Sequence, residues 1–359
     1  MLPRLYLGTM TFGWSQASSK VDVAVATAFV NKFASFSPEV KAHLHVDTAR
    51  IYAGGETEPI VAKALAGATQ ATTDGNLLLG SKAHPSQPGG LSAEGLEKQF
   101  AASCAALEVS SLAEFYLHQP DTEHSLLESL KCTDALVKSG KIGAVGLSNY
   151  HASEVARAFE LCKEHGLTPP SVYQGLYNPL NRLVEEELIP LLHANDCAFV
   201  AYNPLAAGLL TGKHTSPDQV AAGRFKENPN YLPRFYTTDN FAALASIRSA
   251  CDAAGVSLVD AAYRWLLCHS ALDGSQRDGV LLGASSLEQL DANLAACASA
   301  RQAGPLPKPV VDAMDGVWSG IPALREGAFP YWRSFSSDMP DELVQKHGHG
   351  ASYEAHGPK

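Results

Sequence analysis

The sequence predicts an α/β protein, a (β/α)8 TIM barrel, from the number and order of its short and long apolar stretches. Short runs with the length of strands alternate with longer stretches whose apolar residues recur at helical spacing. Eight strands, each followed by a helix, is the number that closes such a barrel. The expected strands are residues 5–8, 43–47, 77–82, 114–118, 143–148, 171–174, 198–202 and 279–283.

The helical stretches are recognised by apolar residues that share one face. Between residues 92 and 107, for example, Leu96, Phe100, Cys104 and Leu107 fall on the same side of a helix. The other expected helices are residues 20–34, 56–66, 124–138, 152–165, 184–194, 240–254, 257–268 and 286–297.

A doubly wound sheet is the alternative arrangement of the same elements. It should carry the pattern GxGxxG after its first strand. Here the first strand is followed by GTMTFGW at residues 8–14, which does not match. The barrel is therefore favoured.

Two segments exceed a minimal barrel. Residues 203–238 form a long connection rich in Gly, Pro and Asn, and loops of that length are usually functional. Beyond residue 300 come two more helix-like pieces and the aromatic group FPYWRSF. We expect one domain over residues 1–340, with the barrel at about 5–297 and a C-terminal substrate-loop segment at about 300–340. Residues 341–359 are expected to be a disordered tail.

The composition is that of a soluble globular enzyme. Hydrophobic residues make up 46% of the 359 residues and charged residues 18%. A formal net charge of −10 argues against a nucleic-acid surface, which needs clustered Lys and Arg. No run approaches the roughly 18 apolar residues of a membrane span. The N-terminus has no apolar signal region.

The seven Cys residues are scattered and never spaced as CxxC. We expect reduced, mostly buried thiols in a cytoplasmic protein, and neither a zinc site nor another metal site.

Four polar residues stand at or just after the ends of successive expected strands: Asp47, Tyr52, Lys82 and His118. A phenol with its ordinary pKa of about 10 is a poor acid at neutral pH. A nearby ammonium lowers that pKa, and a carboxylate can hold the ammonium in place. An imidazole can hydrogen-bond a carbonyl oxygen as negative charge develops on it. Together the four side chains indicate carbonyl reduction, although each alone is more often a packing or solvated residue.

Several motifs in fixed order resemble the signatures of the aldo-keto reductase superfamily. The details are most similar to the branch of aflatoxin-aldehyde and succinic-semialdehyde reductases. The resemblance implies a (β/α)8 barrel that binds NADPH, and it covers roughly nine-tenths of the chain. The matching segments are GTMTFG (8–13), DTARIYAGGETE (47–58), SKAHP (81–85), FYLHQPD (115–121), GLSNY (146–150), YQGLYNPLNR (173–182), AYNPLAAGLLTGK (201–213), GRF (223–225), RFY (234–236), LGASSLEQLDANL (282–294) and YWR (331–333).

The resemblance implies a role for each of the four strand-end residues. Tyr52 is the expected general acid of reduction, and Lys82 and Asp47 tune it. His118 is expected to orient and polarise the substrate carbonyl.

The resemblance also implies a cofactor site. Ser148, Asn149 and Gln174 are expected to hydrogen-bond the nicotinamide carboxamide, and Tyr202 to stack on the nicotinamide ring. The long loop is expected to clasp the bound cofactor. Its expected contacts with the pyrophosphate come from Asn203, Leu205 and Gly208, with positive charge from Lys213 and Arg224. Met10, Asp47 and Gly283 complete the expected contacts with the cofactor.

Ser285 and Ser286 precede an expected helix, whose N-terminus favours an anion. Gln289 and Asn293 lie on one face of that helix. Ser285 with Glu288, and Ser286 with Gln289, also fit a capping box, and capping is compatible with binding a phosphate. No acidic residue stands where the ribose phosphate would lie, so NADPH is favoured over NADH.

The relatives in this branch often accept small aldehydes that bear a carboxylate. Arg234 and Arg333 are the expected partners of that carboxylate, with bracing of loops as the equal alternative. Relatives commonly have Met at the position of Ile51, which alters the pocket beside the reacting centre. The expected apolar wall consists of Trp14, Ile51, Phe235, Tyr331 and Trp332.

These observations together predict an NADPH-dependent reductase of aldehydes or ketones, with small and carboxylated aldehydes as substrates. One alternative is a biosynthetic reductase of one secondary metabolite. The other is an NADPH-binding accessory or regulatory barrel with negligible turnover. We expect a small-molecule carbonyl substrate, no nucleic acid or membrane partner, and a monomer or homodimer.

Overall fold

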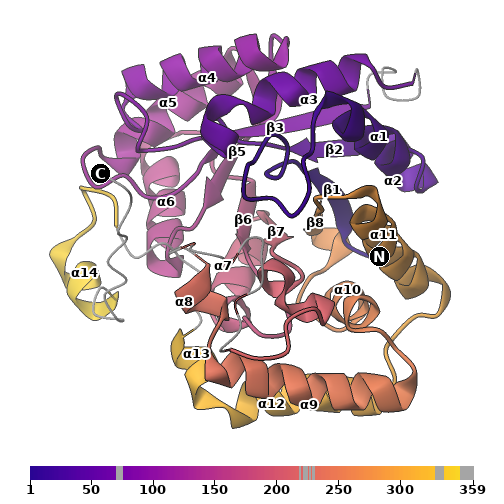
Figure 1. Cartoon of the computed structure of the whole chain (residues 1–359). Helices are drawn as coiled ribbons and strands as arrows, with labels where there is room; N and C mark the ends of the chain where they lie inside the picture. The colour runs from indigo at the N-terminus through magenta and orange to yellow at the C-terminus, as the bar shows by residue number, and fades with distance from the viewer. Residues whose placement is uncertain are drawn as a thin grey trace.

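The computed structural model describes residues 1–69, 76–217, 220, 225, 228, 231–327 and 335–347. It shows a closed barrel of eight parallel strands surrounded by helices (Figure 1). The strands pair in sequence order, and the last strand closes on the first. The predicted (β/α)8 barrel is therefore confirmed.

Every expected strand is present, with boundaries within two residues of those expected from the sequence. The runs are short and rich in Leu, Val, Tyr and Phe, which suit a strand buried on both faces. Their bounds are β1 Arg4–Gly8, β2 Leu44–Asp47, β3 Leu77–Ala83, β4 Leu112–Leu117, β5 Ile142–Ser148, β6 Val172–Leu176, β7 Ala198–Tyr202 and β8 Gly279–Gly283.

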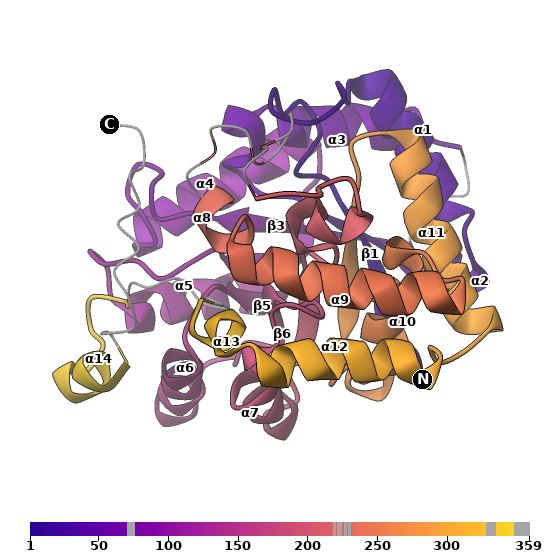
Figure 2. The same ribbon diagram turned by 60° about the horizontal axis from the view of Figure 1, so that its bottom comes forward.

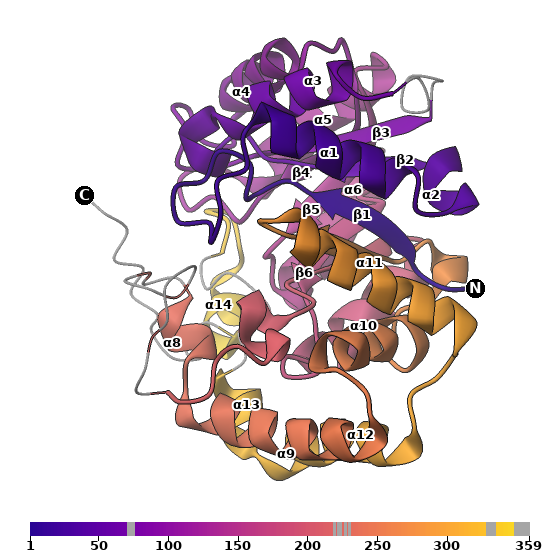
Figure 3. The same cartoon turned by 45° about the vertical axis from the view of Figure 1, so that its right-hand side comes forward.

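The expected helices form the outer ring of the barrel. Several begin at a residue whose side chain accepts a hydrogen bond from a backbone N–H of the first turn, such as Ser92, Ser125 and Ser257. Figure 3 shows two of the helices, α1 and α11, on either side of β1. The bounds are α1 Val23–Ala34, α3 Thr57–Ala66, α4 Ala93–Leu107, α5 Leu126–Lys138, α6 Ala152–His165, α7 Leu188–Ala194, α9 Thr238–Ala254, α10 Leu258–Cys268 and α11 Leu287–Gln302.

Shorter elements occupy the connections. A short helix, α2, precedes β2, in the stretch that is longer than a minimal barrel needs. Another, α8, lies in the long connection between β7 and β8. The bounds are α2 Pro38–Ala42 and α8 Leu232–Phe235, with 3-10 turns η1 Tyr52–Gly55, η3 Leu183–Glu185, η4 Ala206–Thr211 and η5 Gly274–Gln276.

The chain beyond the barrel packs on its outside. Helix α12, Lys308–Gly320, runs beside α9 (Figure 2) and buries Val310, Met314 and Trp318. It is followed by α13, Pro322–Gly327. Residues 341–347, within the segment expected to be a disordered tail, form helix α14, and residues 348–359 lie outside the described residues.

The barrel separates two sets of buried side chains. Odd-numbered residues of β1, such as Leu5 and Leu7, point outward into the layer between strands and helices. The barrel interior has its own cluster, formed by Tyr6, Tyr116, Val172, Val200 and Leu281. Inward-facing side chains from β1, β4, β6, β7 and β8 therefore help to fill the barrel, and two of them, Tyr6 and Tyr116, carry hydroxyl groups.

Within the described part of the chain, no single helix is long and apolar enough to cross a membrane. Helices α9 and α10 taken together have the length and apolar composition of a membrane span, but the chain bends by 95° between them. All seven Cys residues are unpaired thiols, and only Cys268 is not fully buried.

Gly146 on β5 is a position where the packing of the barrel interior requires glycine. A Cβ atom there would lie 2.3 Å from Cδ1 of Tyr116, a ring held inside the barrel. Replacement by Ala should therefore lower the free energy of unfolding by about 1–3 kcal/mol, as overpacking does. Urea denaturation measures this change.

Gly316→Ala is the matched control, because Gly316 lies on the exposed side of α12 with no atom within 4 Å of an added Cβ. It should raise stability by about 0.5–1 kcal/mol, since Ala favours a helix. Equal losses in both variants would contradict the packing argument.

Candidate active site

The four strand-end residues meet at the carboxyl end of the barrel. The Lys82 ammonium donates to both oxygens of Asp47, at 2.7 Å each, and to the backbone carbonyl of Thr48 at 2.8 Å. Its Nζ lies 3.4 Å from the Tyr52 hydroxyl. The Tyr52 and His118 rings meet edge to face, with centroids 5.8 Å apart. The structure thus brings all four side chains into one cluster.

The loop that carries Tyr52 has an unusual backbone. Ala53 has φ of 48° and is followed by Gly54 and Gly55 with φ of 66° and 100°. Arg50 holds this turn from within, because its Nη1 donates to the Gly55 carbonyl at 3.4 Å and to Glu58 Oε2 at 2.8 Å. The position of Tyr52 therefore depends on the Arg50–Glu58 pair.

Glu58 connects that turn to the strand that carries Lys82. Its side chain is fully buried, and its Oε1 accepts a hydrogen bond from the Ser81 hydroxyl at 2.7 Å. Ser81 precedes Lys82 on β3, so the two residues point to opposite faces of the barrel wall. Through Glu58 and Ser81, the loop of Tyr52 is fixed against the strand of Lys82.

Burial changes the proton affinity of the cluster. It lowers the pKa of Lys82, and the Asp47 carboxylate opposes that shift. Burial, aided by Lys82 and His84, holds the pKa of His118 well below its usual value. His118 is therefore a neutral imidazole at neutral pH, and such a ring has one N–H to donate. Its Nδ1 is buried, and no described residue forms a hydrogen bond with it.

The residues expected at the nicotinamide form a hydrogen-bonded row beside this cluster. Gln174 Nε2 donates to Asp47 Oδ1 at 2.9 Å. Asn149 Nδ2 donates to the His118 carbonyl at 2.9 Å and to the Ser148 hydroxyl at 3.1 Å. The Tyr202 hydroxyl donates to Asn149 Oδ1 at 2.7 Å. These four side chains are therefore joined to the cluster through Asp47 and the backbone of His118.

The long connection after β7 begins with left-handed backbone. Asn203, before the η4 turn, has φ of 52°, and Gly208, within that turn, has φ of 110°. Leu205 packs against the core and Lys213 is exposed. Met10 lies on the other side of this region, where its Sδ accepts a hydrogen bond from Tyr231. Arg224 lies outside the described residues.

The start of α11 is built from the expected polar residues. Ser286 caps the helix, and its hydroxyl accepts a hydrogen bond from the Gln289 backbone N–H. The Gln289 side chain reaches back to the backbone N–H of Ser285 at 2.9 Å, one residue earlier than in a standard capping box. Asn293 is buried, and its Nδ2 donates to the Gly283 carbonyl at 3.1 Å. Ser18 hydrogen-bonds both Ser285 and Gln289.

The expected substrate residues are only partly described. Trp14 and Ile51 are half-buried. The Arg234 guanidinium hydrogen-bonds Tyr202 and lowers its pKa, against the larger effect of burial, which raises it. Phe235 is buried in an aromatic cluster with Phe225 and Tyr231. Tyr331, Trp332 and Arg333 lie outside the described residues.

Sequence reasoning missed several residues that shape the site. Arg50, Glu58 and Ser18 act through contacts that the chain pattern does not reveal. His84 was quoted only as part of a motif, yet its ring lies 5.2 Å from that of His118. Within the described residues, no group of three or more His, Cys, Asp or Glu side chains is placed to hold a metal ion.

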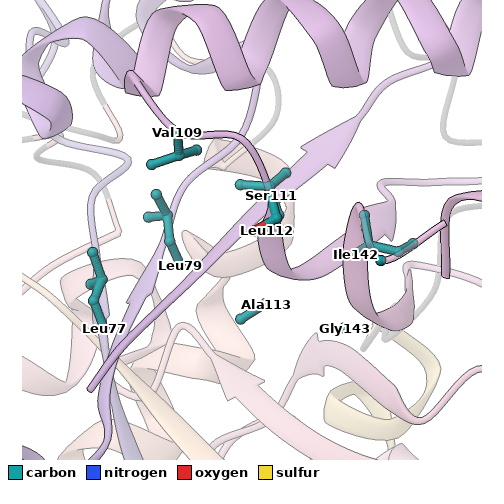
Figure 4. A pocket seen from close by; sticks show the side chains of 9 residues that line it. Leu77, Leu79, Val109, Ser111, Leu112, Ala113, Ile142 and Gly143 are labelled. Atoms are coloured by element: carbon teal, nitrogen blue, oxygen red, sulfur yellow. The ribbon is translucent and has the colours of Figure 1, made fainter. Parts of the chain in front are cut away.

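A hollow at the opposite end of the barrel is unrelated to this cluster. It lies at the amino-terminal ends of β3, β4 and β5, and most of the side chains that line it are apolar (Figure 4). Residues that reach Lys82 or Tyr52 do not line it, so it is not assigned to the reaction. Its lining residues are Leu77, Leu79, Val109, Ser111, Leu112, Ala113, Gly140, Ile142 and Gly143.

The loop after His118 is fixed by Asp121. Its Oδ2 accepts from the Leu91 backbone N–H at 2.7 Å and lies 2.9 Å from His124 Nδ1. Its backbone carbonyl accepts from the Ser337 N–H at 3.1 Å. Asp121 therefore ties the strand end that carries His118 to the C-terminal segment.

That segment is held at two further points. Asp338 Oδ1 accepts from the Leu126 N–H at the start of α5, at 2.8 Å. Glu154 Oε1, fully buried at the start of α6, accepts from the Ser336 N–H at 2.8 Å. Burial raises the pKa of Glu154 to about 7. The C-terminal segment thus docks beside the loop of His118.

Comparison with known proteins assigns this arrangement to a class. A model of the aldo/keto reductase family matches residues 4–318. The chain is 38% identical over 322 residues to human aflatoxin B1 aldehyde reductase member 2, with 87% of this chain and 85% of that protein aligned. It is 36% identical over 329 residues to the mouse protein of the same name, covering 89% and 85%. It is 32% identical over 325 residues to oxidoreductase sirO of Leptosphaeria maculans, covering 88% and 94%.

The chain is therefore an oxidoreductase with a (β/α)8 barrel fold. It belongs to the aldo/keto reductase family, which reduces small carbonyl compounds with a nicotinamide cofactor. The resemblance found in the sequence is confirmed.

Glu154 should make the stability of the protein depend on pH. Its pKa is raised from 4.5 to about 7 in the folded state, so the folded state keeps a proton that the unfolded chain releases. Its contribution therefore favours folding at low pH and is lost as pH rises through this range. The loss amounts to about 3 kcal/mol.

Glu154→Gln removes this titration. The free energy of unfolding of Glu154→Gln minus that of the parent protein should increase by about 2–3 kcal/mol when the pH is raised from about 5 to about 8. Urea denaturation at both pH values measures this difference. Glu164→Gln, at an exposed position on the same helix, is the control and should not change it. A difference for Glu154→Gln that is constant with pH would contradict the prediction.

Proposed function

We propose that this protein reduces aldehydes and ketones to alcohols with NADPH, and that Tyr52 donates the proton. The observation that carries the proposal is the buried Lys82 ammonium, held 2.7 Å from both Asp47 oxygens and 3.4 Å from the Tyr52 hydroxyl. A neutral His118 ring stands beside that hydroxyl.

The cofactor would supply the hydride, and residues of the chain would donate the proton and stabilise the charge that its transfer leaves. Tyr52 gives its hydroxyl proton to the carbonyl oxygen, and Lys82 stabilises the phenolate that remains. Asp47 keeps Lys82 charged and in place. His118 donates its N–H to the same carbonyl oxygen as negative charge develops on it. Because His118 is neutral, it orients the substrate and does not compete with Tyr52 as the acid.

The row beside the cluster fits a nicotinamide. Ser148, Asn149 and Gln174 supply hydroxyl and amide groups for the carboxamide, and three hydrogen bonds fix the orientation of Asn149. Tyr202, at the end of β7, supplies an aromatic face. At the end of β8, an added Cβ on Gly283 would meet no atom within 4 Å, which leaves open space beside the start of α11.

We assign the phosphate end of the cofactor to the start of α11 and the long loop. Ser285, Ser286 and Gln289 provide hydroxyl, amide and backbone groups at a helix N-terminus, where an anion is stabilised. Lys213 and Arg224 add positive charge. None of these residues is acidic, and on this ground NADPH is preferred over NADH.

The proposed substrates are small aldehydes, including those with a carboxylate. The mammalian relatives are named for an aldehyde of aflatoxin B1, which supports an aldehyde substrate. Arg234 hydrogen-bonds Tyr202, so its charge lies within reach of a substrate placed at the nicotinamide. Arg333 is the second proposed partner of the carboxylate. We further propose a cytoplasmic, single-domain enzyme.

Tyr52→Phe should lower kcat by at least about 100-fold, because it removes the proton that completes the reduction. NADPH affinity should stay within about twofold, since the ring is retained. NADPH consumption measures the rate with succinic semialdehyde, carboxybenzaldehyde, nitrobenzaldehyde, methylglyoxal and phenanthrenequinone, and fluorescence titration measures the affinity.

Tyr263→Phe is the matched control for that variant. Tyr263 is buried in α10, and its hydroxyl has no hydrogen-bond partner among the described residues, so its removal should leave kcat unchanged. Full turnover in Tyr52→Phe would remove Tyr52 from its proposed role. NADPH binding by the parent protein without turnover on any of these substrates would indicate an accessory barrel.

Arg234→Ala and Arg333→Ala should each raise KM for carboxylated aldehydes by about tenfold, the loss of one charged hydrogen bond. KM for neutral aldehydes should change by less than about twofold. Arg277→Ala is the control, because Arg277 is ion-paired with Asp196 at the opposite end of the barrel. Equal changes for charged and neutral aldehydes would mean that the two Arg residues only brace loops.

A further inference from the structure

A second carboxylate lies inside the barrel below the Lys82–Asp47 pair. Glu114 is on β4, two residues before Tyr116 and four before His118, so all three side chains face the barrel interior. The Tyr116 hydroxyl donates to Glu114 Oε2 at 2.6 Å, and the Tyr6 hydroxyl, from β1, donates to Oε1 at 3.1 Å. Each oxygen of Glu114 thus accepts from one buried phenol.

Tyr116 connects Glu114 to the active-site ammonium. Lys82 is fully buried, and its Nζ lies 5.5 Å from the centroid of the Tyr116 ring. A cation near an aromatic ring is attracted by the electrons of the ring. Because the hydroxyl of that ring donates to a carboxylate, the ring is richer in electrons than a free phenol. Glu114 also acts directly on Lys82 and, like Asp47, favours its charged form.

The hydrogen bonds of Glu114 favour its ionised form. An ionised carboxylate only accepts, and both of its oxygens here receive an O–H. Burial raises the pKa of Glu114, and the hydrogen bonds from Tyr116 and Tyr6 oppose this. Burial also raises the pKa of both phenols well above its usual value, so they keep the protons that they donate. His45, whose Nδ1 lies 4.0 Å from Oε1, has its pKa lowered by burial to about 3 and is neutral.

The charged and titratable groups around the two residues are few. Those that face Glu114 are Arg4 and Tyr6 on β1, His45 and Asp47 on β2, Lys82 on β3 and Tyr116 on β4. The inward residues of β5 to β8 at this level, Ala144, Gly146, Val172, Val200, Gly279 and Leu281, do not titrate. Those that face Lys82 are Asp47, Tyr52, Glu114, Tyr116 and His118, and Glu58 acts on it from the other side of β3.

We propose that Glu114, acting through Tyr116, is a positioning residue that sets the pH at which the Tyr52–Lys82 pair loses its proton. A negative charge favours the protonated form of every group near it. Asp47, in direct contact, and Glu114, behind the Tyr116 ring, both favour the charged form of one ammonium, so the pair keeps its protons to a higher pH than Asp47 alone would allow. Tyr52 then still holds its proton when the substrate arrives.

The test measures how kcat falls at alkaline pH, which is the alkaline limb of its pH profile. This test rests on the proposed function, because it requires turnover. Glu114→Gln keeps the shape of the side chain and removes its charge. The apparent pKa of the limb should fall by about one unit, whichever member of the coupled pair it reports. Tyr116→Phe, which keeps the ring but removes its link to Glu114, should lower it by about half as much. KM for NADPH should not change, because neither residue contacts the proposed cofactor site.

Two matched variants separate charge from packing. Tyr6→Phe also removes one hydroxyl from Glu114, but Tyr6 has no ring beside Lys82, so the limb should move by less than about a third of the Glu114→Gln shift. Glu114→Asp keeps the charge, so the apparent pKa of its alkaline limb should lie close to that of the parent protein. The same apparent pKa of the alkaline limb in Glu114→Gln and in the parent protein would overturn the proposal. So would equal shifts in Tyr6→Phe and Tyr116→Phe.

A second readout does not depend on turnover. Ultraviolet difference titration follows phenol ionisation in the intact protein, and Tyr52→Phe in each background isolates the signal of Tyr52. Glu114→Gln should lower the apparent pKa of that signal by about one unit. If no carbonyl compound is reduced but this shift is present, the proposed function fails and the role of Glu114 stands. If reduction depends on Tyr52 and neither the limb nor this signal shifts, only the role of Glu114 fails.

Discussion

The buried ion pair between Lys82 and Asp47 is the interaction on which the rest of the site depends. Taking an ammonium out of water costs several kcal/mol unless its hydrogen bonds are replaced. Here two carboxylate oxygens and the Thr48 carbonyl replace them, all within 2.8 Å. These partners come from the end of β2 and the residue after it, beside β3 in the barrel. The register of two neighbouring strands therefore decides whether a charged Lys can exist at this position.

The barrel interior is unusually polar for a space that side chains fill. Beside the aliphatic Val172, Val200 and Leu281, the described residues below the ion pair include Tyr6, His45, Glu114 and Tyr116. The large rings fit because neighbouring strands contribute glycine, as Gly146 does beside Tyr116. His45 is buried, neither of its ring nitrogens is hydrogen-bonded within the part of the chain that the structure describes, and burial keeps it neutral. Among the described residues, the charges in this space are thus the Asp47 and Glu114 carboxylates, the Lys82 ammonium and, at the start of β1, the Arg4 guanidinium, and we infer that their balance affects proton affinity at the carboxyl end.

Much of the fold was predictable because the barrel is built from repeated local patterns. Each strand is a short apolar run, and each helix shows its own buried face, so order and boundaries follow from neighbouring residues. The cluster of Asp47, Lys82 and His118 was predictable for a related reason, since parallel strands bring their carboxyl ends to one face. Tyr52 follows on the first turn after β2.

Contacts between distant segments were not predictable in the same way. Tyr6 and Glu114 are 108 residues apart, and Glu154 and Ser336 are 182 apart. These pairs depend on how strands are staggered and where the C-terminal segment docks, which no local pattern encodes. One signal was available for Glu114. It lies two residues before Tyr116 on β4 and four before His118, and alternate residues of a strand share one face, so the Glu114 side chain is expected to face inward with them. The capping of α11 shows a finer limit, because Gln289 reaches Ser285, one residue before the expected Ser286.

The division between strands and connections explains which part of the function the barrel determines. The groups proposed to transfer the proton stand at strand ends or one turn beyond, so their geometry follows from barrel closure. The residues proposed to contact the substrate come from connections: Trp14 follows β1, Ile51 follows β2, and Arg234 lies in α8. Connections tolerate change that a closed barrel does not, and enzymes of this architecture vary their substrates there. Under the proposed function, the reaction type thus follows from strand register, and substrate choice is assigned to the loops and to the C-terminal segment docked beside His118.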